Sequence, residues 1–163
     1  MAETHFLPDD QGNTARPPLI GTLGVLTFIN CGLFTLVYAL GALTMLAVQS
    51  MPLDEYREMM ESQMAAMPFV EGQEAMVRQG AELLHRSGAL LMLIMLVRTV
   101  VRLYGAIGIW KGRRTGFHIY AAAQLLGIFA PHIVLPWTML GVGGPLMTVA
   151  MTALYGTQLK RLA

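Results

Sequence analysis

The chain contains little charge for its length. Only 13% of its 163 residues are charged, whereas 55% are hydrophobic. About a quarter of the residues of an ordinary soluble domain are charged, so this composition argues against a typical water-soluble domain. The mean hydropathy of +0.54 agrees, and the apolar residues form long runs instead of alternating with polar ones. We therefore expect a membrane protein.

Cysteine is nearly absent, and so are the features of a cleaved signal sequence. Cys31 is the only cysteine, so no disulfide can form within the chain and cysteine usage says nothing about the redox compartment. We expect Cys31 to pack as a small hydrophobic side chain. The N-terminus is acidic before its first basic residue, Arg16, and the apolar stretch behind it is about twice as long as a signal h-region. This stretch should therefore be a retained span.

The chain also lacks the patterns of common catalytic sites. It has no HExxH motif, and its apolar runs contain no acidic pair and no Ser/His/Asp set. The basic, glycine-rich turn at residues 111–114 lacks the pattern and the preceding strand of a phosphate-binding loop. We therefore expect no enzyme, no cofactor and no metal ion.

Four apolar runs are the main feature that is present. A membrane-spanning helix needs about 20 residues, and the runs cover residues 19–48, 88–110, 117–135 and 137–158. Residues 1–18 are polar and are expected to form a mobile cytoplasmic tail. The fold class that we predict is all-α: residues 19–163 form one domain, an integral membrane bundle of four transmembrane helices. Pro131 and Pro136 should kink or unwind the end of the third span.

The polar segment between the first two spans, residues 49–86, should contain an amphipathic helix. Its apolar positions recur in steps of three and four and are Leu53, Tyr56, Met60, Met64 and Met67. Pro68 should end this helix, and a second helix from about Val70 should continue into the next span. Thioethers can bind Cu(I), but a methionine stripe at this spacing more often covers apolar surface, here at the membrane interface.

Small side chains recur every four residues in the first span. The positions are Thr27, Cys31, Thr35 and Ala39, with Gly24 nearby. Such a ridge lets helices approach closely in a membrane. Packing within the chain is the favoured interpretation, and a dimer face is the alternative.

The basic residues predict the orientation of the chain. One group flanks the spans on one side and comprises Arg16, Lys111, Arg113, Arg114, Lys160 and Arg161. The basic residues of segment 49–86 are diluted by seven acidic ones. Because basic loops stay in the cytoplasm, we expect both termini to be cytoplasmic and residues 49–86 to be extracytoplasmic.

Two arginines, Arg98 and Arg102, lie within the second span. Arg98 falls near the middle of a hydrocarbon core of ~30 Å, where an arginine costs about 2.5–3.5 kcal/mol on insertion scales. Arg102 is close enough to the cytoplasmic headgroups to snorkel. Because the four spans contain no Asp or Glu, Arg98 needs freed carbonyls, a water cavity, an anion or polar side chains such as Asn30, Tyr38 or Gln124. Either both arginines are satisfied internally, or they bind an anion, a lipid phosphate or a partner's carboxylate.

Histidines offer one weaker alternative. His118 and His132 lie on the third span and His85 at the outer end of the second. At most, His85 and His132 could hold one haem near the outer face. Interfacial histidines with ordinary hydrogen bonds are the simpler interpretation.

Two stretches resemble a known group of proteins. RPPLIGTLGVLTFINCG opens the first span, and LYGAIGIWKGRRTGFHIYAAAQLLGIFAP runs through the central turn. They are similar to the corresponding parts of a family of small four-helix integral membrane proteins common in Bacteroidota. The resemblance implies the topology and a bacterial inner membrane, and it carries over no activity and no functional residue.

These observations lead to one expected function and two alternatives. We expect a non-enzymatic accessory or scaffold protein of the inner membrane, which packs with lipids and with a partner membrane protein or a second copy, and not with nucleic acid. The first alternative is a small anion transporter or channel that uses Arg98 and Arg102, with glycine and proline breaks in the last two spans as its gate. The second is a haem-bearing redox subunit.

Overall fold

The computed structural model describes residues 6–65, 74–137 and 141–163. Apart from one isolated bridge between Phe6 and Leu162, the regular elements of these residues are all helical. The α-helices are α1 (Pro18–Gln49), α2 (Leu53–Ala65), α3 (Glu74–Trp110), α4 (Arg114–Phe129) and α5 (Gly143–Gly156), and the 3-10 turns include η1 (Ala130–Ile133) and η3 (Leu159–Arg161). The predicted all-α class is confirmed for this part of the chain.

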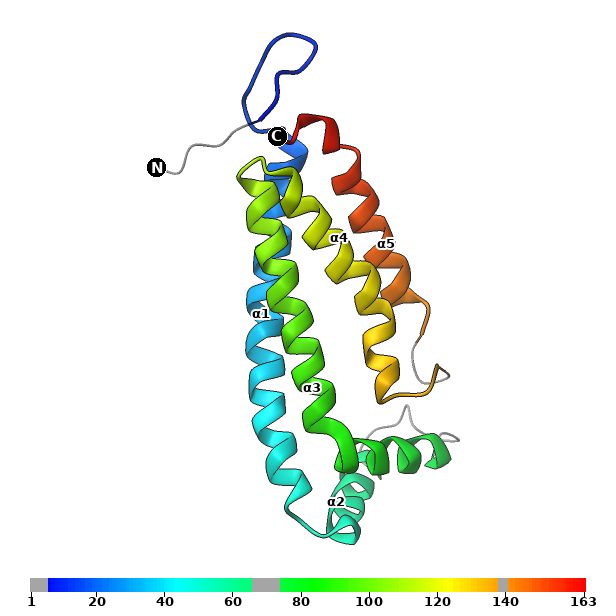
Figure 1. Cartoon of the computed structure of the whole chain (residues 1–163). Helices are drawn as coiled ribbons and strands as arrows, with labels where there is room; N and C mark the ends of the chain where they lie inside the picture. The colour runs from blue at the N-terminus through cyan, green and yellow to red at the C-terminus, as the bar shows by residue number, and fades with distance from the viewer. Residues whose placement is uncertain (1–5, 66–73, 138–140) are drawn as a thin grey trace.

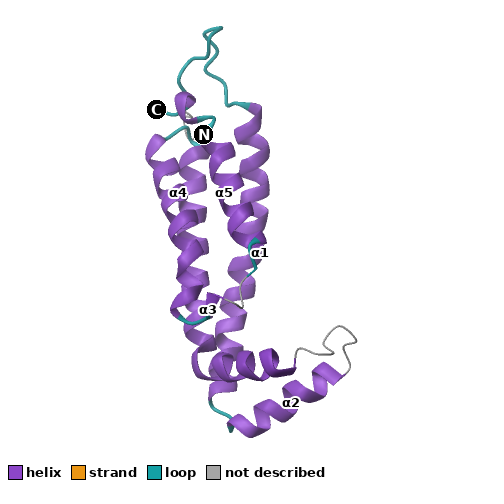
Figure 2. Ribbon diagram, turned by 90° about the vertical axis from the view of Figure 1, so that its right-hand side faces the viewer, coloured by secondary structure: helices purple, strands orange, loops and turns teal. Residues whose placement is uncertain are grey.

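The helices run alongside one another between two ends of the molecule (Figure 1). α1 and α3 are antiparallel neighbours, α4 returns along α3, and α5 lies beside α4. The first described residues, from Phe6 on, and the C-terminus lie at one end, called the terminal end below, with the turn between α3 and α4. α2 lies at the opposite end, where the first turns of α3 run across the molecule before the helix turns along α1 (Figure 2).

Two helices are long and apolar enough to cross a membrane. They are α1, with 32 residues, and residues Arg78–Trp110 of α3, with 33 residues. α4 and α5 contain 16 and 14 residues, fewer than the ~20 that a span usually requires. The third predicted span leaves the α-helical conformation close to the first of the two prolines expected to interrupt it: α4 ends at Phe129, and η1 begins at Ala130, one residue before Pro131. The described residues thus contain two candidate spans.

The predicted small-residue ridge of α1 faces inward. Gly24, Thr27 and Cys31 are buried, whereas leucines on the other side, such as Leu36 and Leu43, are 64% and 65% exposed. Gly24 lies against the Trp110 ring, so that a Cβ at this position would overlap the indole. Packing within the chain, the favoured interpretation of the ridge, is therefore confirmed for these three residues, whereas Thr35 and Ala39 are only partly buried.

Glycines bring α3 and α4 into backbone contact. A Cβ at Gly116 would lie 2.6 Å from the Cα of Gly108, and a Cβ at Gly105 would lie 2.5 Å from the backbone nitrogen of Tyr120. The turn between the helices closes at Gly112, whose φ of 81° is in the left-handed region that glycine adopts without strain. The close approach of the two helices therefore depends on missing side chains.

The amphipathic helix expected within residues 49–86 is present as α2. Tyr56 is buried against Val48 and Ala81, while Arg57 reaches the carboxylates of Asp54 and Glu82. The next helix continues from Glu74 into the second candidate span, as expected. The predictions for the side chains of Met64 and Met67, for the break at Pro68 and for the helix start at Val70 lie outside the described residues.

Residues 6–17 pack against the C-terminus, a contact that the sequence pattern did not predict. Phe6 and Leu162 are 5% and 1% exposed. Arg161 binds the N-terminal segment through donations to the carbonyls of Leu7 (2.8 Å), Asn13 (2.8 Å) and Ala15 (3.1 Å) and through an ion pair with Asp9, at 3.1 Å. One guanidinium therefore binds four residues of the segment and helps to hold it at the terminal end.

Acid should loosen this terminal contact. The Asn13 backbone N–H, followed by that of Gln11 and by the Arg161 guanidinium, holds the pKa of the Asp9 carboxyl below its ordinary 3.8. A carboxyl whose pKa is lowered by folding stabilises the fold above its unfolded pKa and loses this effect as the pH falls through the folded value. The Leu7 amide donates to the Arg161 carbonyl. As the pH is lowered below about 3.8, we expect this amide to lose protection against hydrogen exchange, after correction for the intrinsic exchange rate.

The matched variant is Asp9→Asn, which keeps the size of the side chain and removes its charge. Its Leu7 amide should be less protected at neutral pH and should show little further change between about pH 5 and pH 2.5. The same acid-dependent loss in both proteins would show that Asp9 is not responsible.

Candidate functional site

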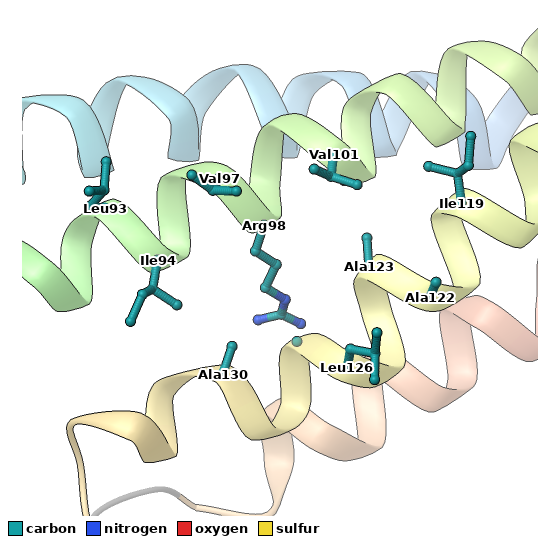
Figure 3. A pocket seen from close by; sticks show the side chains of 11 residues that line it. Leu93, Ile94, Val97, Arg98, Val101, Ile119, Ala122, Ala123, Leu126 and Ala130 are labelled. Carbon is teal, nitrogen blue, oxygen red and sulfur yellow. The ribbon is translucent and has the colours of Figure 1, made fainter.

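The candidate site is built around Arg98 of α3. Its side chain leaves α3 and points toward α4 (Figure 3). Nη2 lies 3.4 Å from Gln124 Oε1 of α4 and 3.4 Å from Thr148 Oγ1 of α5. Both distances are long for hydrogen bonds, and the buried Nε has no partner among the described residues. The guanidinium is therefore only weakly satisfied within the chain.

Gly127 makes room for this guanidinium. A Cβ at position 127 would lie 2.5 Å from Arg98 Cδ and 2.8 Å from Cζ, and it would also overlap Nε. Gly127 and Gln124 are three residues apart on α4 and so share one face of the helix. One face of α4 thus supplies the Arg98 guanidinium with space, at Gly127, and with an acceptor, Gln124.

A chain of polar side chains connects Arg98 to α1 through the interior. Gln124 donates from Nε2 to the hydroxyl of Tyr120 over 3.2 Å. The rings of Tyr120 and Tyr155 meet edge to face with centroids 4.8 Å apart, and the Tyr155 hydroxyl lies 3.0 Å from Thr27 Oγ1. Because buried polar groups are costly without partners, these contacts fix α1, α4 and α5 relative to one another.

Arg102 points to a different helix. Its Nε lies 3.2 Å from Cys31 Sγ, and its Nη2 donates to Asn30 Oδ1, both on α1. The sequence places this residue within snorkelling reach of the cytoplasmic headgroups, and in the structure its side chain contacts acceptors on the neighbouring helix. Arginine side chains of a helix lean toward its N-terminus, away from the nearer terminal end. The side chains of Arg98 and Arg102 therefore contact different helices.

An apolar groove with a volume of about 640 Å³ lies beside Arg98 between α3 and α4. The α3 wall includes Leu93, Val97 and Val101, and the α4 wall includes Ala122, Ala123 and Leu126 (Figure 3). Val97 and Leu126 are 55% and 70% exposed, so the groove opens to the outside of the molecule. Arg98 is the only charged or polar side chain in the lining.

The histidines have local partners. His85 Nε2 lies 2.9 Å from the carbonyl of Met51. His132 stacks on Trp137 with ring centroids 3.4 Å apart, and its Nδ1 lies 3.3 Å from the Leu135 carbonyl. Within the described parts of the chain, no three His, Cys, Asp or Glu side chains gather in a way that could hold a metal ion.

Sequence reasoning identified Arg98 and named Gln124 among its possible partners, but it missed Thr148 and Gly127. Asn30, another candidate for Arg98, contacts Arg102 instead. The spacing of Gly127 and Gln124, three residues apart on one helix face, could have indicated that Gly127 also lies beside Arg98. No sequence pattern relates Thr148 to Arg98.

The chain matches no protein-family model, no curated protein and no solved structure.

Proposed function

We propose that the chain is a non-enzymatic accessory protein of the bacterial inner membrane that holds a partner membrane protein or a lipid in the groove beside Arg98. The observation that carries this proposal is a single charged side chain, Arg98, in the wall of an otherwise apolar groove that opens outward. A membrane arginine without a counter-charge is costly, and an occupant that supplies an acceptor would remove that cost.

The exposed surface supports a membrane location. Only 11% of the most apolar window of α1 and 22% of that of α3 is buried, so neither is the enclosed core helix of a soluble protein. Exposed leucines such as Leu36, Leu40 and Leu43 would form an apolar patch in water far larger than soluble proteins tolerate. Lipid is the solvent that suits these side chains.

Four spans and a cytoplasmic terminal end are the topology that we propose. α4 and α5 lie along α3, and side chains on them such as Leu126, Leu146 and Met147 are 65–70% exposed. α4 and η1 together cover residues 114–133, about the length that a bilayer core requires. The exposed basic residues Arg113, Arg114 and Lys160 lie at the terminal end, and the bias of basic residues toward the cytoplasm supports this orientation.

Anion transport through both arginines has less support, because Arg98 and Arg102 contact different helices and the groove offers an ion only one polar group.

Native mass spectrometry tests the accessory role. The chain would be tagged at its C-terminus, expressed in its native host and solubilised in a mild detergent. We expect wild type to retain a stoichiometric protein or lipid that Arg98→Gln loses. The matched control is Arg102→Gln, one helical turn away and facing α1, which should retain it. An unaccompanied wild-type chain, or equal retention by both variants, would contradict the accessory role.

A further inference from the structure

We propose that the occupant of the groove is a single transmembrane helix of another protein, with an Asp or Glu near its midpoint that pairs with Arg98. This inference rests on the proposed function and names the partner by its chemistry.

The described part of the chain offers Arg98 no counter-charge. All ten acidic residues lie within residues 3–10 and 54–82, outside the predicted spans, and none of the ion pairs among the described residues involves Arg98. Glu82 is 16 residues before Arg98 on α3, about 24 Å away along the helix at about 1.5 Å per residue. A second copy has the same spans without Asp or Glu, so it offers no carboxylate at this depth either.

Depth also argues against a lipid headgroup. Arg98 lies 12 residues from Arg86 and 12 from Trp110, about 18 Å from either along α3. In a hydrocarbon core of about 30 Å, this places Arg98 near the midplane. Phosphates of the bilayer lie outside the core, beyond the reach of the side chain. A transmembrane helix, in contrast, can carry a carboxylate at any depth.

The walls of the groove carry side chains against which a helix can pack. Leu93, Val97 and Val101 are four residues apart and form one ridge of α3. Ala122 and Ala123 of the α4 wall have small side chains, which let another helix approach closely where no hydrophobic effect drives packing. The volume of about 640 Å³ accepts several side chains.

A free inorganic anion fits this lining poorly. Apart from Arg98, every lining side chain is apolar, so the ion would lose its water and meet hydrocarbon on most sides. On a partner helix, only the carboxylate would face Arg98, and the apolar side chains of the same helix would contact the apolar walls of the groove. Charge and lining together therefore favour an acidic transmembrane helix.

Energy transfer in vesicles tests this inference with defined probes. The full chain, with a donor fluorophore at its C-terminus, would be reconstituted in phosphatidylcholine and phosphatidylglycerol. Leucine-rich transmembrane peptides would carry an acceptor and Glu, Gln or Leu at the central position. We expect the Glu peptide to bind about tenfold tighter than the Gln peptide, a factor that corresponds to about 1.4 kcal/mol.

Three variants make the result specific. Arg98→Gln should reduce the preference for Glu to less than about twofold, and Arg102→Gln should keep it at about tenfold. Ala122→Phe should weaken binding of all three peptides, because the ring fills the groove; Ala122 is exposed, so this change leaves the fold intact even if Arg98→Gln perturbs it.

The outcomes separate this inference from the proposed function. Equal binding of the Glu and Gln peptides would overturn it, and so would an Arg98-dependent anionic lipid in the native mass spectra. Either result leaves the accessory role standing if an Arg98-dependent occupant is still retained. If no peptide binds and no occupant depends on Arg98, both fail.

Discussion

Gly116→Ala should destabilise the fold by about 3 kcal/mol, a large effect for one methyl group. The new Cβ would lie 2.5 Å from the Gly108 carbonyl carbon and 2.6 Å from the Ile109 nitrogen. These are backbone atoms of α3, so no rotamer change can relieve the overlap, and α3 and α4 must separate. The melting temperature in detergent, followed by helical circular dichroism, should fall by roughly 6–12 °C.

Gly32→Ala is the matched control for this substitution. Gly32 lies on α1, and its missing Cβ has no heavy atom within 4 Å. Alanine is also the better helix former, so this variant should melt at or slightly above the wild-type temperature. If the two variants behaved alike, α3 and α4 would not pack as closely as the backbone contacts between Gly108 and Gly116 require.

Gly127→Ala should destabilise the protein by about 1–2 kcal/mol through Arg98. The added methyl group overlaps the outer part of the Arg98 side chain, which must shift away from Gln124 and Thr148. Both contacts are already long, at 3.4 Å, so the cost is that of leaving a partly buried charged group with fewer polar neighbours. The measurement is the melting temperature of the variant in the same detergent.

A double-mutant cycle identifies Arg98 as the cause. In an Arg98→Ala background the space beside residue 127 is free, and Gly127→Ala should change stability by less than about 0.5 kcal/mol. The coupling energy between the two sites should therefore be about 1–3 kcal/mol. Additive effects would mean that the guanidinium does not lie over Gly127.

Much of the fold could be predicted because it depends on local patterns. The long apolar run before Gln49, the ridge at Gly24, Thr27 and Cys31, and the break at Pro131 each follow from periodicity or from backbone chemistry. The lengths of the last two helices did not follow. α4 leaves the α-helical conformation at Ala130, and α5 begins only at Gly143, so both α-helices are shorter than the apolar runs 117–135 and 137–158.

The site could be predicted only in part. A lone arginine in an apolar run can be recognised from sequence, and Gln124 was one of several possible partners. Thr148 lies 50 residues away on α5, and which helix faces Arg98 depends on the glycine contacts between α3 and α4. The groove arises from this tertiary packing, so no local pattern indicates it.

The groove is proposed to face lipid and not water, and the accessibility of Leu126 to oxygen and to a water-soluble reagent tests this directly. A nitroxide attached through Leu126→Cys, in a Cys31→Ser background in liposomes, would report it by electron paramagnetic resonance, with Asp10→Cys in the exposed N-terminal segment as the aqueous reference. We predict strong relaxation by oxygen and almost none by a water-soluble nickel complex at position 126, with the reverse at position 10. Strong relaxation by the nickel complex at position 126 would contradict a groove that faces the bilayer core.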